Sequence, residues 1–385
     1  MFNSIIIHYG EIGIKGKNRS FFEKKLVDNL RWSLKNSDII SVKRISGRII
    51  IEIDKSTKLA EIKEKLSNVF GIAHFSFAVR TNLNLEDIKR ISLELTQDKK
   101  PFKVKTVRSN KSFEHSSSNV NNIIGEVIVK NKKLKVNLDN PEQTIFIEIT
   151  DKDAFVYNEK IKSLGGLPVG VSGKIISLIS GGIDSPVSSY LMMKRGCSVI
   201  FIHFFNSTIN TKQSLEKVIS LVDVLSKYQF KTKLYLIPFE NIQKEIIKFV
   251  NSKYRMIIYK RYMLKISEKV LENESASALV DGSNLGQVAS QTISNLEVIN
   301  NAVTKYNIFQ PLISFDKEEI IQIAKKIKTF DISILPYQDC CSFLISEHPA
   351  TKSNLKEIES FELQLNEKEL IEEAVKKAQT KQKLN

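Results

Sequence analysis

The sequence predicts a protein of the α/β class, in which α+β domains precede a doubly wound parallel sheet. Beyond Lys174, apolar runs of strand length alternate with segments of helical periodicity, as in a parallel sheet covered by helices on both faces. The first run ends in Ser-Gly-Gly-Ile-Asp-Ser at residues 180–185, and a helical pattern follows directly. Before Lys174, single helices stand between strand pairs, which favours smaller α+β folds.

Composition limits the class of protein. The chain has 385 residues, 42% of them hydrophobic, so it can form two or three domains with real cores. Its net charge of +15 indicates a polyanionic partner, first of all nucleic acid, although a lysine-rich background composition would explain part of the charge. Three cysteines do not make a disulfide framework and fit a reducing cytosol. The lack of a Cys-x-x-Cys pair argues against an all-thiolate zinc or iron–sulfur site. No signal peptide or apolar run of about 20 residues is present, so we predict a soluble cytoplasmic protein without membrane contact.

The N-terminal elements predict two small domains. Residues 1–56 contain a strand at 4–8, a helix at 19–34 and a hairpin at 41–53, which suggest a ferredoxin-like α+β domain. Residues 57–160 form the second predicted domain. Its expected helices cover residues 59–68, 85–96 and 119–129, and its expected strands cover residues 71–81, 101–108, 135–138, 144–150 and 153–157.

A glycine-rich linker at residues 161–173 leads to the last predicted domain, residues 174–385. The expected strands are 174–179, 198–205, 233–238, 278–281 and 308–312. The expected helices are 186–195, 212–228, 241–273 (with a break), 286–295 and 317–328, followed by a charged helical tail at 354–385. Ligands of such sheets bind beyond the carboxyl ends of the strands, where the segments at 180–185, 203–205 and 281–283 lie.

The segment 180–185 predicts a phosphate-binding loop. Gly181 and Gly182 allow positive φ and leave backbone N–H groups open to a ligand, while Ser185 is a good N-cap and Pro186 suits the first helical position. The helix N-terminus then offers unpaired N–H groups to an anion. Asp184 would hold Mg²⁺ or orient the loop. An ordinary strand-to-helix turn, with Asp184 bonding its own backbone, is the alternative.

The segment Asp281–Gln291 has a similar position after an apolar strand. Gly282 permits close approach of a purine or ribose, and the amides of Gln287 and Gln291 can bind a base or a phosphate. Alone, the segment is better explained as a capped polar loop, but next to the 180–185 loop in such a sheet the nucleotide-binding interpretation is favoured.

Two adjacent cysteines, Cys340 and Cys341, lie between Asp339 and Ser342, which suggests exposure and reactivity. One thiolate can carry a persulfide sulfur, and its neighbour can release that sulfur by forming a disulfide. An incidental thiol pair is the alternative. Cys197, at the edge of an apolar strand, fits a buried structural thiol. The five histidines show no metal-ligand spacing.

Basic residues interleaved with Phe113 and His115 suggest contacts to an RNA backbone and stacking on bases. A solvated charged face would look the same. The candidate RNA-binding residues are Lys15, Lys17, Arg19, Lys103, Lys105, Arg108 and Lys111.

Six blocks occur in one order along nearly the whole chain: HYGEIGIKGKNRSFFE, SLGGLPVG, LISGGIDSPV, GSNLGQVASQT, FDKEEIIQIAKKIKTFDISILPYQDCCSF and HPATKS. Together they closely resemble the tRNA 4-thiouridine synthases, the uridine sulfurtransferases of the ThiI type. The resemblance implies that an N-terminal ferredoxin-like domain and a THUMP domain bind tRNA, and that an ATP pyrophosphatase (PP-loop) domain follows them. It implies that ATP adenylates the C4 oxygen of uridine 8 in tRNA, and that a persulfide sulfur then displaces AMP.

The resemblance also implies the ATP-binding residues. These are Leu178, Ile179, Ser180, Gly181, Gly182, Asp184, Ser185, His203, Phe204, Lys260, Arg261, Gly282 and Gln291. Lys260 stands where the family has the first arginine of a pair, and Ser283 and Asn284 stand where a glutamate is usual. These substitutions affect individual contacts, since a lysine keeps the charge but lacks the guanidinium fork.

The sequence after Cys341 is too short for the rhodanese domain of some members, so we expect the short form of the family. Sulfur would then come from a cysteine desulfurase, directly or through a carrier, to Cys340 or Cys341. A homodimer and sulfur transfer for thiamine thiazole synthesis are further expectations. Two alternatives stay open: another adenylating ligase on the same fold, and an RNA-binding protein with an inactive nucleotide site.

Overall fold

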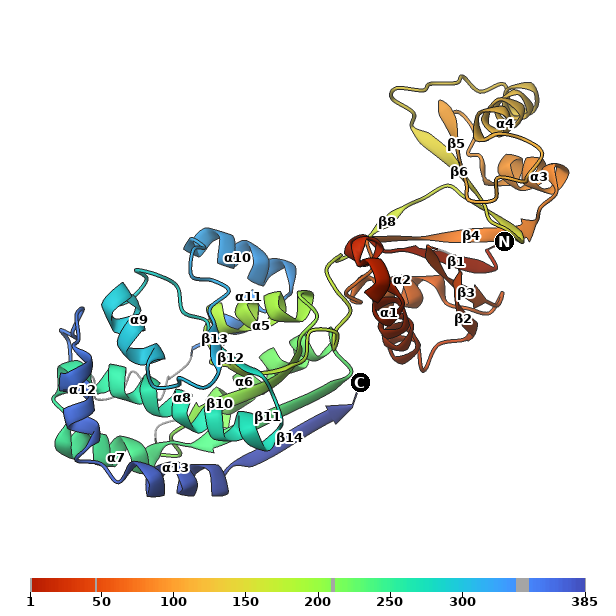
Figure 1. Cartoon of the computed structure of the whole chain (residues 1–385). Coiled ribbons are helices and arrows are strands. Elements are labelled where there is room, and N and C mark those ends of the chain that lie inside the picture. Colours follow the sequence, from red (N-terminus) through yellow and green to blue (C-terminus); the bar gives the residue numbers. More distant parts are fainter. Residues whose placement is uncertain (1, 46, 209–211, 337–345, 385) are drawn as a thin grey trace. The chain divides into compact units, whose positions relative to one another are not determined.

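The computed structural model describes residues 2–45, 47–208, 212–336 and 346–384. The chain divides into two compact units, Met1–Pro168 and Val169–Asn385 (Figure 1). Among the described residues, no helix is long and apolar enough to cross a membrane.

The first unit contains one continuous sheet with the strand order β2-β3-β1-β4-β7-β6-β5, and β8 pairs with β4. Only β5 and β6 are parallel neighbours. The strands are β1 (Ser4–His8), β2 (Ile39–Ile45), β3 (Arg48–Ile53), β4 (His74–Asn82), β5 (Phe102–Arg108), β6 (Gln143–Ile149), β7 (Asp153–Tyr157) and β8 (Ile161–Lys162). The helices are α1 (Arg19–Ser33), α2 (Leu59–Ser67), α3 (Leu85–Leu95) and α4 (Ser117–Lys132).

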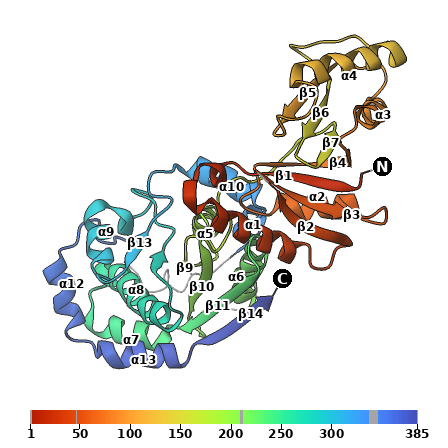
Figure 2. The same cartoon turned by 45° about the vertical axis from the view of Figure 1, so that its right-hand side comes forward.

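Two apolar cores lie under these helices, and strand β4 is shared between them (Figure 2). Its first half pairs with β1 and its second half with β7. Ile62 and Leu66 of α2 and Phe75 of β4 are buried in the first core. The first fold therefore extends beyond the predicted boundary at residue 56, because α2 and β4 complete it. The predicted strand at 135–138 is absent, since only Val136 forms an isolated bridge, to Phe102.

A buried polar network centred on Glu148 joins the two folds of the first unit. Glu148 Oε1 lies 2.9 Å from His8 Nε2 and accepts a 2.7 Å hydrogen bond from the Tyr157 hydroxyl. Arg48 Nε lies 2.7 Å from Glu148 Oε2. The rings of His8 and His74 stack with their centroids 4.5 Å apart. Burial alone would raise the pKa of Glu148, but the His8 hydrogen bond and the charges of His8 and Arg48 lower it to about 2.

This network predicts a loss of stability in acid. Burial and the neighbouring His8 lower the pKa of His74 to about 4. Between pH 6.5 and 4 the unfolded chain therefore binds a proton that the folded chain does not, so stability falls as pH falls. Below pH 4.5 the same argument applies to Glu148. Allowing for the partial exposure of His74, we expect its contribution to reach about 2 kcal/mol.

Trp32, the only tryptophan of the chain, lies in α1 and reports on the first unit in the intact protein. The urea midpoint followed by its fluorescence should fall between pH 7 and pH 4.5. His74→Gln should flatten this dependence, and equal pH slopes in both proteins would contradict the assignment.

The second unit has a six-stranded sheet with the order β13-β12-β9-β10-β11-β14. The first five strands are parallel neighbours, as predicted, and β14 is antiparallel to β11. Helices α5 and α6 pack on one face and α8 and α13 on the other (Figure 1). The strands are β9 (Lys174–Leu178), β10 (Ser198–Phe205), β11 (Lys231–Pro238), β12 (Ala278–Val280), β13 (Asn307–Phe309) and β14 (Gln379–Leu384).

Helix bounds differ from the prediction in two places. Residues 241–273 are broken as predicted, into α7 and α8, with a 3₁₀ turn between them. The helix predicted at 286–295 begins only at Ile293, because Gly286 has a positive φ and Thr292 caps the helix by accepting from the Asn295 N–H. The helices are α5 (Asp184–Lys194), α6 (Lys212–Ser226), α7 (Glu240–Phe249), α8 (Arg255–Asn273), α9 (Ile293–Asn300), α10 (Lys317–Lys326), α11 (Phe330–Ser333), α12 (Leu355–Glu362) and α13 (Glu367–Lys376).

The predicted helical tail is wrong beyond Lys376, where β14 forms the edge of the sheet. Its sequence, QTKQKL, is polar at nearly every position, so it carries none of the alternation that marks a half-buried strand. Lysines on an edge strand also discourage pairing with other chains.

Candidate nucleotide-binding site

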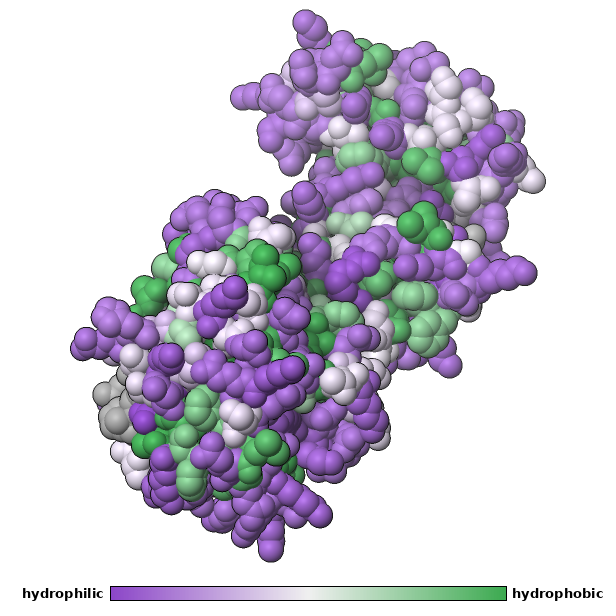
Figure 3. Space-filling view, turned by 60° about the vertical axis from the view of Figure 1, so that its left-hand side comes forward, coloured by the Kyte–Doolittle hydropathy of each residue, from purple (hydrophilic) through white to green (hydrophobic). Residues whose placement is uncertain are grey.

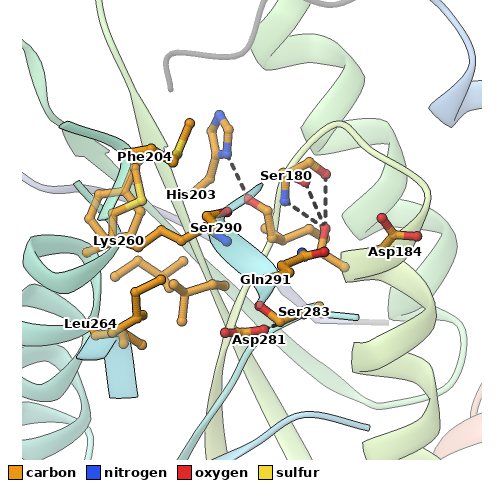
Figure 4. Close-up of a pocket in the computed structure, with 18 of the residues that line it drawn as sticks. Ser180, Asp184, His203, Phe204, Lys260, Leu264, Asp281, Ser283, Ser290 and Gln291 are labelled. Carbon is orange, nitrogen blue, oxygen red and sulfur yellow. Dashed lines mark hydrogen bonds between the residues drawn. The ribbon is translucent and has the colours of Figure 1, made fainter. Parts of the chain in front are cut away.

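A cavity of about 310 Å³ lies at the carboxyl ends of β9, β10 and β12 (Figure 4). This is the edge of a parallel sheet where ligands bind. Ten residues predicted for ATP binding line the cavity together. They are Leu178, Ile179, Ser180, Asp184, Ser185, His203, Phe204, Lys260, Gly282 and Gln291.

The loop after β9 is held by its own hydroxyl groups. Ser185 Oγ accepts a 2.8 Å hydrogen bond from the Ser180 N–H and lies 3.2 Å from Ser180 Oγ (Figure 4). Two predicted details are wrong, since α5 begins at Asp184: Ser185 is not the N-cap, and Pro186 is not the first helical residue. Gly181 and Gly182, which can adopt positive φ, do not do so here. Neither glycine lines the cavity. The N-terminus of α5 still faces the loop, as a phosphate site requires.

Both carboxylate oxygens of Asp184 have partners within the second unit. Lys317 Nζ lies 2.6 Å from Oδ1, and Gln287 Nε2 donates to Oδ2 at 3.0 Å. Lys317 was not predicted as a site residue, because the sequence FDKEE indicates only a helix start, and Asp316 and Glu319 do form a capping box there. The ion pair between Asp184 and Lys317 therefore places a cation beside the loop after β9.

Gly282 is required by a close approach of two backbones. A Cβ at this position would lie 3.0 Å from Ser185 N and 3.0 Å from Ser185 Cα. The loop after β12 therefore presses directly on the first turn of α5, and the hydroxyl of Ser188 adds a 2.9 Å hydrogen bond to the Asp281 carbonyl. From the sequence we predicted that a nucleotide would approach Gly282 closely. The neighbour in the structure is the backbone of Ser185.

Gly282→Ala is expected to weaken ATP binding by about 5- to 150-fold, because overpacking at backbone atoms costs about 1–3 kcal/mol and displaces the loop. Calorimetric titration with ATP measures this. Gly125→Ala, in α4, is the control, since a Cβ there meets nothing within 4 Å. Equal affinities of Gly282→Ala and the unaltered protein would contradict the close approach.

The cavity has an apolar end. Ile202, Phe204, Met263 and Leu264 line it together with Met256 and Ile299. Gln291 is 8% exposed, and its Oε1 is buried without a hydrogen-bond partner among the described residues. A buried acceptor of this kind costs free energy unless a ligand supplies a donor.

One lysine and one histidine side chain also line the cavity. Lys260 lines it and forms no hydrogen bond or ion pair with any residue that the structure describes. His203 is buried, and its Nδ1 donates to the Ile179 carbonyl at 2.8 Å, which fixes the ring beside the first strand end.

Arg261 does not line the cavity. It is buried and forms a two-pronged ion pair with Glu362, with Nε–Oε1 and Nη2–Oε2 distances of 2.9 and 2.7 Å. Consecutive residues of a helix point in different directions, so Lys260 and Arg261 of α8 cannot both face the ligand. Burial alone would raise the pKa of Glu362, but Arg261 and Lys265 lower it. Arg261 thus fastens α12 to α8.

Cys340 and Cys341 lie outside the described residues. Cys197 is buried, as predicted, and burial raises the pKa of its thiol. Within the described part of the chain, no group of three His, Cys, Asp or Glu side chains could hold a metal ion.

Two predicted RNA-binding residues, Arg19 and Arg108, form hydrogen bonds within the first unit. Arg19 donates to Glu23 and to the Tyr9 hydroxyl, both at 2.7 Å. Arg108 donates to the carbonyls of Phe113 and His115, each at 2.8 Å. Three others are bound weakly or not at all to the described residues: Lys103 donates to the Leu138 carbonyl at 3.3 Å, and Lys17 and Lys111 form no hydrogen bond or ion pair there. Lys15 lies over the Phe22 ring, and Lys105 lies near Lys160.

Comparison with known families agrees with this architecture. The family model described as thiamine biosynthesis protein (ThiI) matches residues 170–366. The ThiI ferredoxin-like domain matches residues 4–76, and the THUMP domain matches residues 82–159. This chain belongs to the ThiI family. The end of the ferredoxin-like match at residue 76 agrees with the place of α2 and β4 in the first core.

The ThiI-family relatives are similar along almost their whole length. A probable tRNA sulfurtransferase of Thermoanaerobacter sp. (strain X514) is 43% identical over 357 residues, which cover 92% of this chain and 93% of the relative. One of Moorella thermoacetica is 39% identical over 378 residues, covering 97% and 96%. A solved 4-thiouridine synthetase–RNA complex with bound ATP matches with a TM-score of 0.92 and 34% identity, and the match covers 100% of both chains. The PH1313 protein of Pyrococcus horikoshii matches with a TM-score of 0.68 and 27% identity, covering 85% and 99%.

Proposed function

We propose that this chain converts uridine 8 of tRNA to 4-thiouridine with ATP as the activating substrate. The chain is a sulfurtransferase enzyme of the ThiI family, and ATP-dependent thiolation of tRNA is the activity of this group. The observation that carries the proposal is the cavity at the end of β9. It combines a phosphate loop with an apolar end in a chain that matches an ATP-bound 4-thiouridine synthetase over its full length.

The two ends of the cavity suit the two parts of ATP. The apolar end offers contact area for the adenine ring, and Gln291 Oε1 can accept a hydrogen bond from its amino group. The triphosphate would lie at the Ser180 loop, where the N-terminus of α5 and the cations Lys317 and Lys260 face its negative charge.

Adenylation turns the C4 oxygen of uracil into part of a good leaving group. The C4 oxygen of uracil is amide-like and leaves poorly, but it leaves well once it is part of AMP. The C4 oxygen attacks the α-phosphorus, the bond to the pyrophosphate breaks, and the N3 proton is lost to water or a base. The Ser180 loop, Lys317 and Lys260 stabilise the negative charge of the departing pyrophosphate.

Mg²⁺ fits this site through oxygen ligands. Asp184 and Asp281 line the cavity, and Mg²⁺ commonly binds substrate phosphates together with one or two carboxylates. When bound, the ion would neutralise phosphate charge. Asp184 would have to exchange its contact with Lys317 for one with the ion.

The sulfur step is assigned to Cys340 and Cys341. A persulfide on one cysteine attacks C4 and displaces AMP. The thiolate of the other cysteine then attacks the sulfur atom of the first, which breaks the S–S bond, leaves sulfur on C4 and forms a disulfide. A cysteine desulfurase would supply the sulfur, and a thiol reductant would restore the cysteines. We also propose that the protein works in the cytoplasm, where tRNA and ATP occur. A homodimer is a further proposal, which comes from the family resemblance alone.

One reconstitution tests this function. The purified protein, unmodified tRNA, Mg-ATP, a cysteine desulfurase, cysteine and a thiol reductant should yield 4-thiouridine, seen by its near-ultraviolet absorbance. AMP formation without this product, even with a sulfur carrier added, would contradict the thiolation.

A further inference from the structure

A basic hollow lies between α1 and β2 in the first unit, apart from all residues considered above for RNA binding. Its volume is about 550 Å³. The floor contains Val27 and Val42, which are buried, and the rims carry Lys24 and Arg31 on α1 and Lys43 on β2, with Arg44 beside it. We call this site the α1–β2 hollow.

The rims carry an excess of positive charge. Lys24, Arg31, Lys43 and Arg44 are exposed, and Asp28 is the only acidic residue among those that line the hollow. The lining itself has four cations against one anion. Glu52 and Glu23, outside the lining, pair with Lys43 and Arg44, and Asp28 lies 4.0 Å from Arg31, so Lys24 is the cation without an acidic neighbour among the described residues.

Three of these cations are held in place by neighbours. Arg31 donates to the Val42 carbonyl at 3.3 Å, Lys43 lies 3.1 Å from Glu52, and Arg44 lies 3.3 Å from Glu23. Such contacts position the charged groups at the rim, while their exposed fractions of 60%, 63% and 44% leave them open to a ligand. Lys24 has no hydrogen bond or ion pair with any described residue, so it keeps its full charge for a partner.

The geometry suits an extended polyanion better than a small one. Ser20, Lys24 and Arg31 follow one face of α1 over 11 residues, which is about 16 Å along the helix. A small anion would bind at one point, whereas this row and the facing strand can contact several successive phosphates. Hydrophilic residues also dominate the face seen in Figure 3, as expected for a protein with a net charge of +15.

We infer that the α1–β2 hollow binds the phosphate backbone of the substrate RNA, with Lys24 and Arg31 as phosphate contacts. This inference rests on the proposed function, since it takes tRNA as the polyanion. It assigns a role to α1 that the basic residues predicted from the sequence do not include. Contacts of this kind add affinity and register and carry no sequence specificity.

The test uses the full-length protein and an unmodified tRNA transcript. The dissociation constant is measured by fluorescence anisotropy between 50 and 200 mM KCl. Each phosphate contact contributes about 0.7–0.9 to the slope of log K against log salt. Lys24→Gln combined with Arg31→Gln should therefore lower the magnitude of the slope by about 1.5 and weaken binding about 30-fold near 100 mM salt, relative to equal affinities at 1 M.

Two further variants make the result specific. Lys24→Gln alone should lower the slope by about 0.8, and Lys24→Arg should keep it, since arginine also binds phosphate. This single change disturbs no described contact, so a folding defect would not explain its effect. Lys55→Gln with Lys58→Gln, two exposed lysines outside the hollow, is the matched control and should leave the slope unchanged.

The outcomes separate the two proposals. If the unaltered protein binds tRNA and the hollow variants have its slope and affinity, the α1–β2 hollow does not bind RNA, although the proposed function stands. If the control lowers the slope as much as the hollow variants do, the effect is one of net charge, and the inference fails. If the unaltered protein does not bind tRNA, the proposed function fails.

Discussion

Replacing Cys340 and Cys341 together with serine is expected to abolish 4-thiouridine formation while AMP formation from ATP and tRNA continues. Serine has nearly the shape of cysteine but cannot carry a persulfide, so only the sulfur step is lost. The measurement pairs near-ultraviolet absorbance of the tRNA with chromatographic detection of AMP.

The single replacements distinguish the two thiols. If one cysteine accepts the persulfide and the other releases it, the variant that lacks the acceptor should take no labelled sulfur from the desulfurase. The variant that lacks only the releasing thiol should take up label and stall after one attack. Cys197→Ser is a control because this thiol is buried away from solvent. A double variant that still thiolates would contradict the role of the pair.

Asp184→Asn is expected to reduce the rate of adenylation by about 100-fold or more, because it removes the carboxylate charge that would hold Mg²⁺ or position Lys317 beside the phosphates. Asparagine keeps the shape and an acceptor for the Gln287 amide, but it loses the ion pair with Lys317. Pyrophosphate release in the presence of tRNA measures the rate. A rate equal to that of the unaltered protein would show that Asp184 is only a turn residue.

Two comparisons decide how Asp184 acts. If it holds Mg²⁺, raising the Mg²⁺ concentration should restore part of the Asp184→Asn rate. If it works by positioning Lys317, then Lys317→Met should reproduce the loss, and extra Mg²⁺ should not restore it. Gln287→Ala is the matched control, since it removes the other partner of Asp184 and leaves its charge and its ion pair.

The strand ends made much of the site predictable. Ser180, His203 and Gly282 follow apolar runs, and carboxyl ends of parallel strands converge at one edge of a sheet. Lys317 escaped prediction because it is far from Asp184 in sequence, and its local pattern is explained by helix capping alone. Arg261 was predicted only from the arginine pair of the family, and its side chain instead pairs with Glu362, because successive residues of a helix point in different directions.

The C-terminal boundary of the first domain could not be predicted from the sequence, because long-range packing contacts decide it. An amphipathic helix such as α2 fits either of two neighbouring cores, and only the packing of Ile62 and Leu66 assigns it to the first. Polar β14 had no apolar alternation, so its pairing with β11 could not be foreseen.

The pairing of β14 with β11 also bears on synthesis of the protein. Residues 231–238 emerge from the ribosome long before residues 379–384, and domains commonly begin to fold as they emerge. The edge of β11 must therefore stay open while the intervening helices are translated. During that interval a nascent chain presents an unpaired strand, and a chain stalled before residue 379 would keep one.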